Sequence, residues 1–86
     1  MTNAEMTLAI IRKGFEVRKS WVMDVCSAVH SIEVKQRSSV SVRFSIDYRI
    51  PRSELDMLMD SAGAMELVEE RLLRQMYGKI VEEEFK

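Results

Sequence analysis

The longest regular pattern of hydrophobic and polar positions lies between residues 39 and 50, which read SVSVRFSIDYRI. Apolar or aromatic side chains occupy every even position from Val40 to Ile50, and serine, arginine and aspartate occupy the odd positions. A period of two places alternate side chains on opposite faces of a strand. The stretch therefore predicts a long β-strand with one apolar and one polar face. It ends at Pro51, because proline has no amide hydrogen to donate to a sheet.

A second strand precedes it from about residue 31, since Ile32 and Val34 share the parity of the apolar set. The two strands form an antiparallel hairpin, and an odd-length turn is needed to keep like faces together. The simplest turn is a three-residue loop over residues 37–39, with a five-residue loop in the same register as the alternative. The expected pairs are Gln36 with Val40, Val34 with Val42, Ile32 with Phe44, and Glu33 with Arg43 as an ion pair.

Helical spacing describes the beginning of the chain. The sequence TNAE from Thr2 to Glu5 has the spacing of a capping box, so we expect a helix to begin there. The apolar residues that follow at a spacing near 3.6 are Leu8, Ile11, Phe15, Val22, Val25 and Val29. They predict a helix from about residue 3 to about residue 28, weakened at Gly14. The β-branched residues between Val17 and Val29 leave open an extra strand in this region.

After Pro51, the sequence SELD at residues 53–56 predicts a second helix with an acidic first turn. Its expected buried stripe consists of Leu55, Leu58, Met59 and Ala62, and a later stripe consists of Met65, Val68, Leu72, Met76 and Ile80. Residues 61–64, SAGA, leave two alternatives open. Either one helix runs from Ser53 to about Glu84, or a short helix precedes a longer one.

The expected fold is therefore α+β, a single domain over residues 1–86 with the order helix, strand, strand, and C-terminal helix or helix pair (αββα). A two-stranded hairpin is marginally stable in water, and both of its edges stay open to pairing. We expect a second subunit to complete the sheet, which makes the protein a homo-oligomer, a dimer or higher.

Composition agrees with a small globular protein and excludes several classes. A chain of 86 residues and 10.0 kDa has a thin core, and its 47% hydrophobic and 31% charged residues indicate neither disorder nor a membrane span. The single cysteine cannot form an internal disulfide, and the N-terminus lacks a basic start, so we expect a cytoplasmic location. Residues 1–52 hold nine basic and five acidic residues, whereas residues 53–86 hold four and nine. Halves of opposite charge favour association with each other or with partners.

No constellation of residues predicts catalysis. Cys26 and His30 are one helical turn apart, but a metal site needs more ligands, so we interpret Cys26 as a small buried residue and His30 as lying near a helix-to-strand boundary. The acidic residues Glu69, Glu70 and 82–84 are expected to be solvated, and the three scattered glycines form no phosphate-binding loop. We expect a protein that is not an enzyme and that has no cofactor or metal.

Two surfaces are candidates for binding. The basic candidates, on or next to the polar face of the hairpin, are Lys35, Arg37, Arg43, Arg49 and Arg52, which suit phosphate groups. The candidates for a protein interface are Trp21, Phe44, Tyr48, Met65 and Met76, since aromatic residues and methionine are common where surfaces adapt to partners.

The first hypothesis is a small non-enzymatic homo-oligomer that binds a protein partner as an adaptor, regulator or inhibitor. Small chains of this kind are common among the accessory proteins of bacteriophages and mobile elements, and we favour that source. The alternative is a nucleic-acid-binding module that uses the arginines of the hairpin. No membrane contact is expected.

Overall fold

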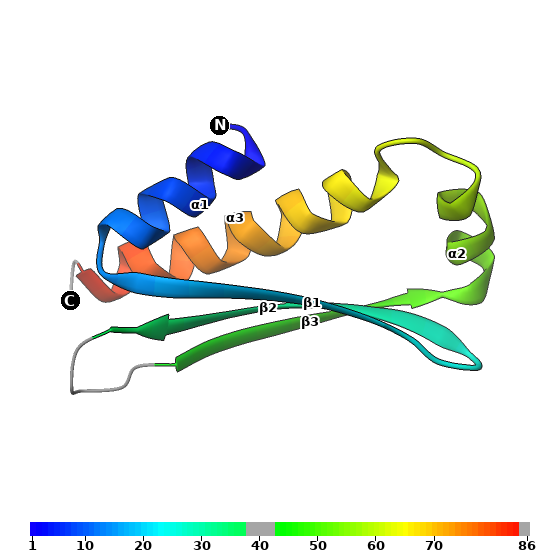
Figure 1. Cartoon of the computed structure of the whole chain (residues 1–86), viewed down its shortest axis with the longest axis horizontal. Coiled ribbons are helices and arrows are strands. Elements are labelled where there is room, and N and C mark those ends of the chain that lie inside the picture. Colours follow the sequence, from blue (N-terminus) through cyan, green and yellow to red (C-terminus); the bar gives the residue numbers. More distant parts are fainter. Residues whose placement is uncertain (38–42, 85–86) are drawn as a thin grey trace.

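The computed structural model describes the backbone of residues 1–37 and 43–84. Its elements are α1 (Asn3–Arg12), β1 (Phe15–Met23), β2 (Ser27–Gln36), β3 (Arg43–Pro51), α2 (Arg52–Met59) and α3 (Ala64–Glu84). The three strands form one antiparallel sheet in the order β1-β2-β3. All three helices lie on the same face of this sheet, and the other face is open (Figure 1).

Helix α1 begins where the capping-box spacing at Thr2–Glu5 predicts. The hydroxyl of Thr2 accepts a hydrogen bond from the backbone N–H of Glu5 at 3.2 Å and donates one to the Glu5 carboxylate at 3.2 Å. Asn3, the first residue of α1, also donates its side-chain amide to the backbone carbonyl of Glu66 at 3.0 Å. The cap therefore starts α1 and fastens it to α3 at the same point.

The predicted helix from residue 3 to about residue 28 is wrong beyond Lys13, and the alternative of an extra strand is confirmed. Gly14 has φ +92°, a backbone conformation that glycine adopts without a steric penalty, and it ends the helix. Its carbonyl accepts a hydrogen bond of 2.9 Å from the backbone N–H of Arg37. The chain thus turns at Gly14 and enters β1 beside the end of β2.

The strand faces of the hairpin are as predicted, but its register differs by two residues. Val34 lies opposite Phe44, Ile32 opposite Ile46, and Lys35 opposite Arg43. The shift preserves parity, so apolar residues still face apolar residues. The expected pairings of Val34 with Val42 and of Ile32 with Phe44 are therefore wrong. The expected pairing of Gln36 with Val40, and the loop itself, involve residues 38–42, which lie outside the described part of the chain.

The predicted ion pair between Glu33 and Arg43 is present, although the two residues are not directly opposite. Glu33 lies opposite Ser45, and the Arg43 guanidinium reaches its carboxylate diagonally at 2.7 Å. Diagonal neighbours are within reach of a long side chain such as arginine. The predicted ion pair therefore forms even though the observed register differs from the predicted one.

The αββα description is corrected to α-βββ-αα by the presence of β1. The inference that a second subunit must complete the sheet loses its premise, because β2 has a neighbour on each side within the chain. Three strands packed against helices can be stable on their own. The α+β class is confirmed.

The C-terminal helix is interrupted, so the second of the two alternatives is confirmed. Gly63 has φ +89° and separates α2 from α3. The expected stripe of α2 is partly wrong, since Met59 is 72% exposed and Ala62 is exposed, while Leu55 and Leu58 are half-buried. A helix of eight residues that crosses the end of the sheet buries little of its surface.

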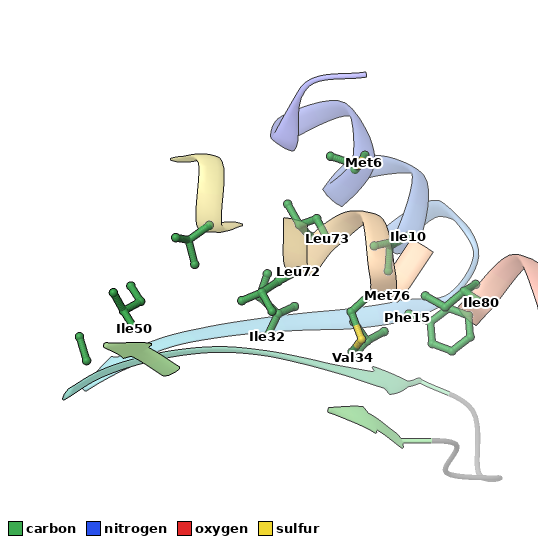
Figure 2. Packing of buried hydrophobic residues seen from close by; sticks show 12 residues of the cluster. Met6, Ile10, Phe15, Ile32, Val34, Ile50, Leu72, Leu73, Met76 and Ile80 are labelled. Carbon is green, nitrogen blue, oxygen red and sulfur yellow. The ribbon is translucent and has the colours of Figure 1, made fainter. Parts of the chain in front are cut away.

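The core lies between α3 and the sheet (Figure 2). Its fully buried side chains, each under 3% exposed, are Met6, Ile10, Ala28, Ile32, Val34, Ile50, Leu72, Leu73, Met76 and Ile80. Four residues of the predicted α3 stripe, Val68, Leu72, Met76 and Ile80, are buried as expected, while Met65 is 36% exposed. No helix in the described ranges is long and apolar enough to cross a membrane.

Candidate functional site

One end of the molecule carries most of the exposed apolar side chains. The end of the β1–β2 hairpin, α2 and the beginning of α3 all lie at this end (Figure 1). Of the ten large hydrophobic side chains exposed in the described residues, eight belong to these segments: Trp21, Val22, Met23, Val25, Met57, Met59, Met65 and Leu67. We call these eight residues the apolar end. Clusters of exposed apolar side chains on a soluble protein mark interaction sites more often than chance.

A tight turn holds the tip of the hairpin. Asp24 accepts hydrogen bonds through Oδ1 from the backbone N–H groups of Cys26 at 2.9 Å and Ser27 at 2.6 Å. These bonds favour the charged carboxylate and lower the pKa of Asp24 below its ordinary value. The turn exposes Val25, whose side chain is 90% accessible. Cys26 is exposed beside it, so its interpretation as a buried residue is wrong.

A groove lies at the apolar end between α2, the start of α3 and β3. Its volume is about 320 Å³, and its lining residues are Tyr48, Glu54, Met57, Leu58, Ser61, Ala64, Leu67, Val68 and Arg71. The lining is mainly apolar and aromatic, with Glu54 on the α2 side and Arg71 on the α3 side. Such a groove can accept apolar side chains from another chain and offer charges of both signs at its sides.

An aromatic pair lies on the helix-covered face of the sheet near the same end. The Trp21 and His30 rings meet edge to face, with centroids 5.6 Å apart and planes at 82°. His30 is only 6% exposed. Its expected place at a helix-to-strand boundary is wrong, because it lies within β2, opposite Tyr48 of β3, and a strand rather than a helix precedes β2. Burial lowers its pKa below the ordinary value of 6.5, although Glu69 acts in the opposite direction. Burial therefore favours the neutral imidazole over the charged one.

Lys19 interrupts the apolar alternation of β1. It points to the helix-covered face along with Phe15, Val17 and Trp21, by the register with β2. There its ammonium group forms an ion pair with the carboxylate of Glu69 on α3. The pair ties the edge strand β1 to α3 and supplies a partner for a charge that would otherwise face an apolar surface.

The five basic residues predicted as binding candidates do not all lie on one surface. Lys35, Arg43 and Arg49 lie on the open face of the sheet, whereas Arg37 follows β2 and Arg52 opens α2, both exposed.

Acidic side chains on the open face neutralise part of this charge. Glu33 lies 2.7 Å from Arg43 and 3.4 Å from Lys35, and Glu16 lies 3.1 Å from Arg18 on the same face. The Arg43 hydrogen bond, more than Lys35, lowers the pKa of Glu33. A phosphate group would therefore compete with carboxylates already bound to these bases.

The five residues predicted as interface candidates also lie in different parts of the structure. Trp21 and Met65 belong to the apolar end, and Tyr48 lines the groove beside it. Phe44 is half-buried and packs on Phe15 with ring centroids 6.2 Å apart. Met76 is fully buried in the core, so its side chain is used within the chain.

Several residues of the apolar end were not predicted. Val22 and Val25 were expected on a helix, but they lie on β1 and in the turn after it, and Met59 was expected on a buried stripe but is exposed. Leu67 and Met57 fall outside the predicted apolar stripes, and that off-stripe position was the signal that could have identified them.

Within the residues that the structure describes, no group of three or more His, Cys, Asp or Glu side chains is arranged to hold a metal ion. No family model, curated protein or solved structure matches this chain.

Proposed function

We propose that this chain is a small non-enzymatic protein-binding protein, an adaptor, regulator or inhibitor, that acts as a homo-oligomer and binds a partner through its apolar end. The observation that carries the proposal is the concentration of large exposed apolar side chains on that end. Exposed single apolar residues are normal on any surface, but eight of them on three adjoining segments are not.

The energetics of burial support the same proposal. Met57, Met59 and Leu67 are 71%, 72% and 62% exposed. Covering one such side chain contributes up to roughly 1.5–3 kcal/mol, less what binding costs in conformational freedom. Methionine adapts its shape readily to a partner surface. Three or four such contacts around the groove are enough to form the centre of an interface.

The groove indicates the chemistry of the partner. Its apolar lining favours apolar side chains, while Glu54 and Arg71 suit a segment that carries charges of both signs beside them. We expect the partner to present a folded or helical protein segment with an apolar stripe flanked by charges, since this shape fits between two helices.

Affinity capture of the tagged chain from its source cells tests the proposal. Replacing Met57 and Leu67 together with Asp should reduce the captured partner at least about tenfold, because both side chains line the groove. The matched control is Leu8→Asp, which changes a 49% exposed apolar residue on α1, away from this end. Circular dichroism checks that both variants fold. Equal capture by both variants contradicts the proposal.

Nucleic-acid binding through the open face is the second candidate, supported by the absence of any helix over Lys35, Arg43 and Arg49 in the described structure. Nuclease treatment during capture separates the two functions. If nucleic acid is the ligand, nuclease removes the captured material and replacing Arg43 and Arg49 with Ala abolishes binding and its salt dependence. A protein bound at the apolar end survives nuclease treatment.

A further inference from the structure

The outer edge of β3 is open to another strand. In the described structure β3 pairs with β2 on one side and contacts α2 and α3, and no element lies along its other side. Its pairing with β2 runs without a bulge from Arg43 to Pro51. Bulges, prolines and charges that point inward protect many edge strands. The charged residues of β3 lie on the open face, its helix-covered residues are apolar or aromatic, and its one proline, Pro51, stands at its very end. Alternate residues between Arg43 and Ile50 therefore direct their N–H and C=O groups outward along a regular edge.

The opposite edge is less suited to pairing with itself. Two copies of β1 that overlap over all nine residues would place Lys19 opposite Lys19 of the second copy. Like charges directly opposite each other are destabilising. Each Lys19 also has a partner already, Glu69 of its own chain.

Charge complementarity distinguishes the ways in which two copies of β3 can pair. Around a two-fold axis, the numbers of opposite residues add up to a constant, so the residue on the axis determines every pair. An axis at Asp47 places two aspartates together, and an axis at Ile46 places Arg43 opposite Arg49. An axis at Tyr48 places Asp47 of each copy opposite Arg49 of the other. Only the last of these three registers forms two ion pairs on the open face.

An axis at Ser45 is the competing register with complementary charges, because it sets Arg43 opposite Asp47. Arg43, however, is already bound to Glu33 at 2.7 Å. Arg49 is exposed, and the Tyr48 register gives it a carboxylate at cross-strand distance.

We propose that a second copy of this chain pairs antiparallel with the outer edge of β3, with the two-fold axis at Tyr48. The two three-stranded sheets then join into one sheet of six strands, with the helices of both copies on the same face. Ile46 of one copy lies opposite Ile50 of the other, so the half-buried Ile46 gains an apolar neighbour.

The second copy also extends the candidate site. Tyr48 lines the groove at the apolar end, and the axis brings the two Tyr48 side chains together. The grooves of the two copies then adjoin at the tyrosine pair. This inference rests on the homo-oligomer in the proposed function and names its surface.

Charge reversal tests the register. Either Asp47→Arg or Arg49→Asp alone creates two pairs of like charges in the dimer, one on each side of the axis. Each single variant should raise the dimer dissociation constant about five- to thirtyfold, measured by light scattering across a concentration series. The double variant exchanges the two charges and should restore the dissociation constant to within about threefold. The control Arg18→Asp, on the same face but on β1, should leave it unchanged.

Cross-linking tests the axis directly. In a Cys26→Ser background, Tyr48→Cys should give a rapid covalent dimer with a short thiol-reactive cross-linker, because the two positions face each other. Ile46→Cys is the control: its two copies lie about 14 Å apart, four strand residues from each other, and should not cross-link.

The outcomes separate this inference from the broader proposal. A wild-type protein that stays monomeric at about 100 μM overturns both the homo-oligomer and this surface. A dimer that is insensitive to the charge reversals, or that cross-links at position 46 and not at position 48, overturns this surface alone. Partner capture by the monomeric charge-reversal variants reports on the apolar end independently.

Discussion

The indole of Trp21 and the buried imidazole of His30 meet edge to face, with ring centroids 5.6 Å apart. The pair joins β1 to β2 at the end of the sheet where the exposed apolar residues gather. The Nδ1 atom of His30 has no hydrogen-bond partner in the described structure. Stability and the packing of the apolar end are therefore coupled to the charge of one histidine.

Acidification should destabilise the fold through His30. Burial lowers its pKa in the folded protein, so the unfolded chain binds the proton more readily. The stability from neutral His30 is fully present above its ordinary pKa of 6.5 and is lost as the pH falls below that value toward the lower folded pKa. Urea unfolding at about pH 7.5 and 5.5 measures the loss, and His30→Phe should remove most of this pH dependence. An unchanged slope in that variant would show that other groups are responsible.

The two glycines Gly14 and Gly78 should respond oppositely to alanine. Gly14 has φ +92°, so Gly14→Ala should destabilise the fold by about 1–2 kcal/mol although an added Cβ has open space around it. Gly78 lies within α3, where an added Cβ also meets no atom within 4 Å. Gly78→Ala should stabilise by about 0.5–1 kcal/mol, because alanine favours a helix. Thermal and urea unfolding of both variants test the pair, and equal effects would contradict the assigned backbone conformation.

The middle of the sheet should be sensitive to cavities. Ile32 is 0% exposed under α3, so Ile32→Ala should cost about 2–5 kcal/mol of unfolding free energy and Ile32→Val about 0.5–1.5 kcal/mol. The control Leu67→Ala changes a side chain that is 62% exposed and should stay within about 0.5 kcal/mol of the wild type. Urea unfolding curves give all three values, and a mild effect of Ile32→Ala would place this residue outside the core.

Glu33 should titrate below an ordinary glutamate because Arg43 donates to its carboxylate at 2.7 Å. Arg43→Ala should raise its pKa toward the ordinary value of 4.5, and Lys35→Ala should raise it less. The contribution of this pair to stability is present above the ordinary pKa of glutamate and disappears as the pH falls through the lowered folded value. NMR titration of the Glu33 side chain measures the shift. An Arg43→Ala variant with an unmoved pKa would exclude the ion pair in solution.

Much of the fold follows from local patterns. The alternation from Val40 to Ile50 predicts which face each side chain of β3 takes, and the described residues of this strand obey it. Thr2 and Pro51 mark the beginning of α1 and the end of β3, because a side-chain cap and a missing amide act on the nearest residues alone.

The main error in the prediction from sequence is that residues 15–23 were expected to be helical, and Lys19 explains this error. A lysine at the centre of the segment breaks the alternation between Val17 and Trp21, which made a helix the better match. Its partner Glu69 lies 50 residues away in the sequence. No local pattern reveals the contact between Lys19 and Glu69. The sequence does contain a local signal for the end of a helix, because Gly14 directly follows Arg12 and Lys13.

The candidate site was predicted least well. Trp21, Tyr48 and Met65 were predicted as interface residues. The groove, however, depends on the angle between α2 and α3, which the chain sets where it turns at Gly63. That angle is determined by packing between distant segments.

The side-chain faces of β3 and of residues 31–36, the beginning of α1 and the end of β3 follow from the sequence, because backbone period, caps and proline are local properties. Contacts between distant segments are needed for three other features: residues 15–23 form a strand, the β2–β3 register differs from the expected one by two residues, and His30 is buried. Each of these depends on partners that the chain brings together only when it folds: Glu69 for Lys19, Phe44 for Val34, and Trp21 for His30.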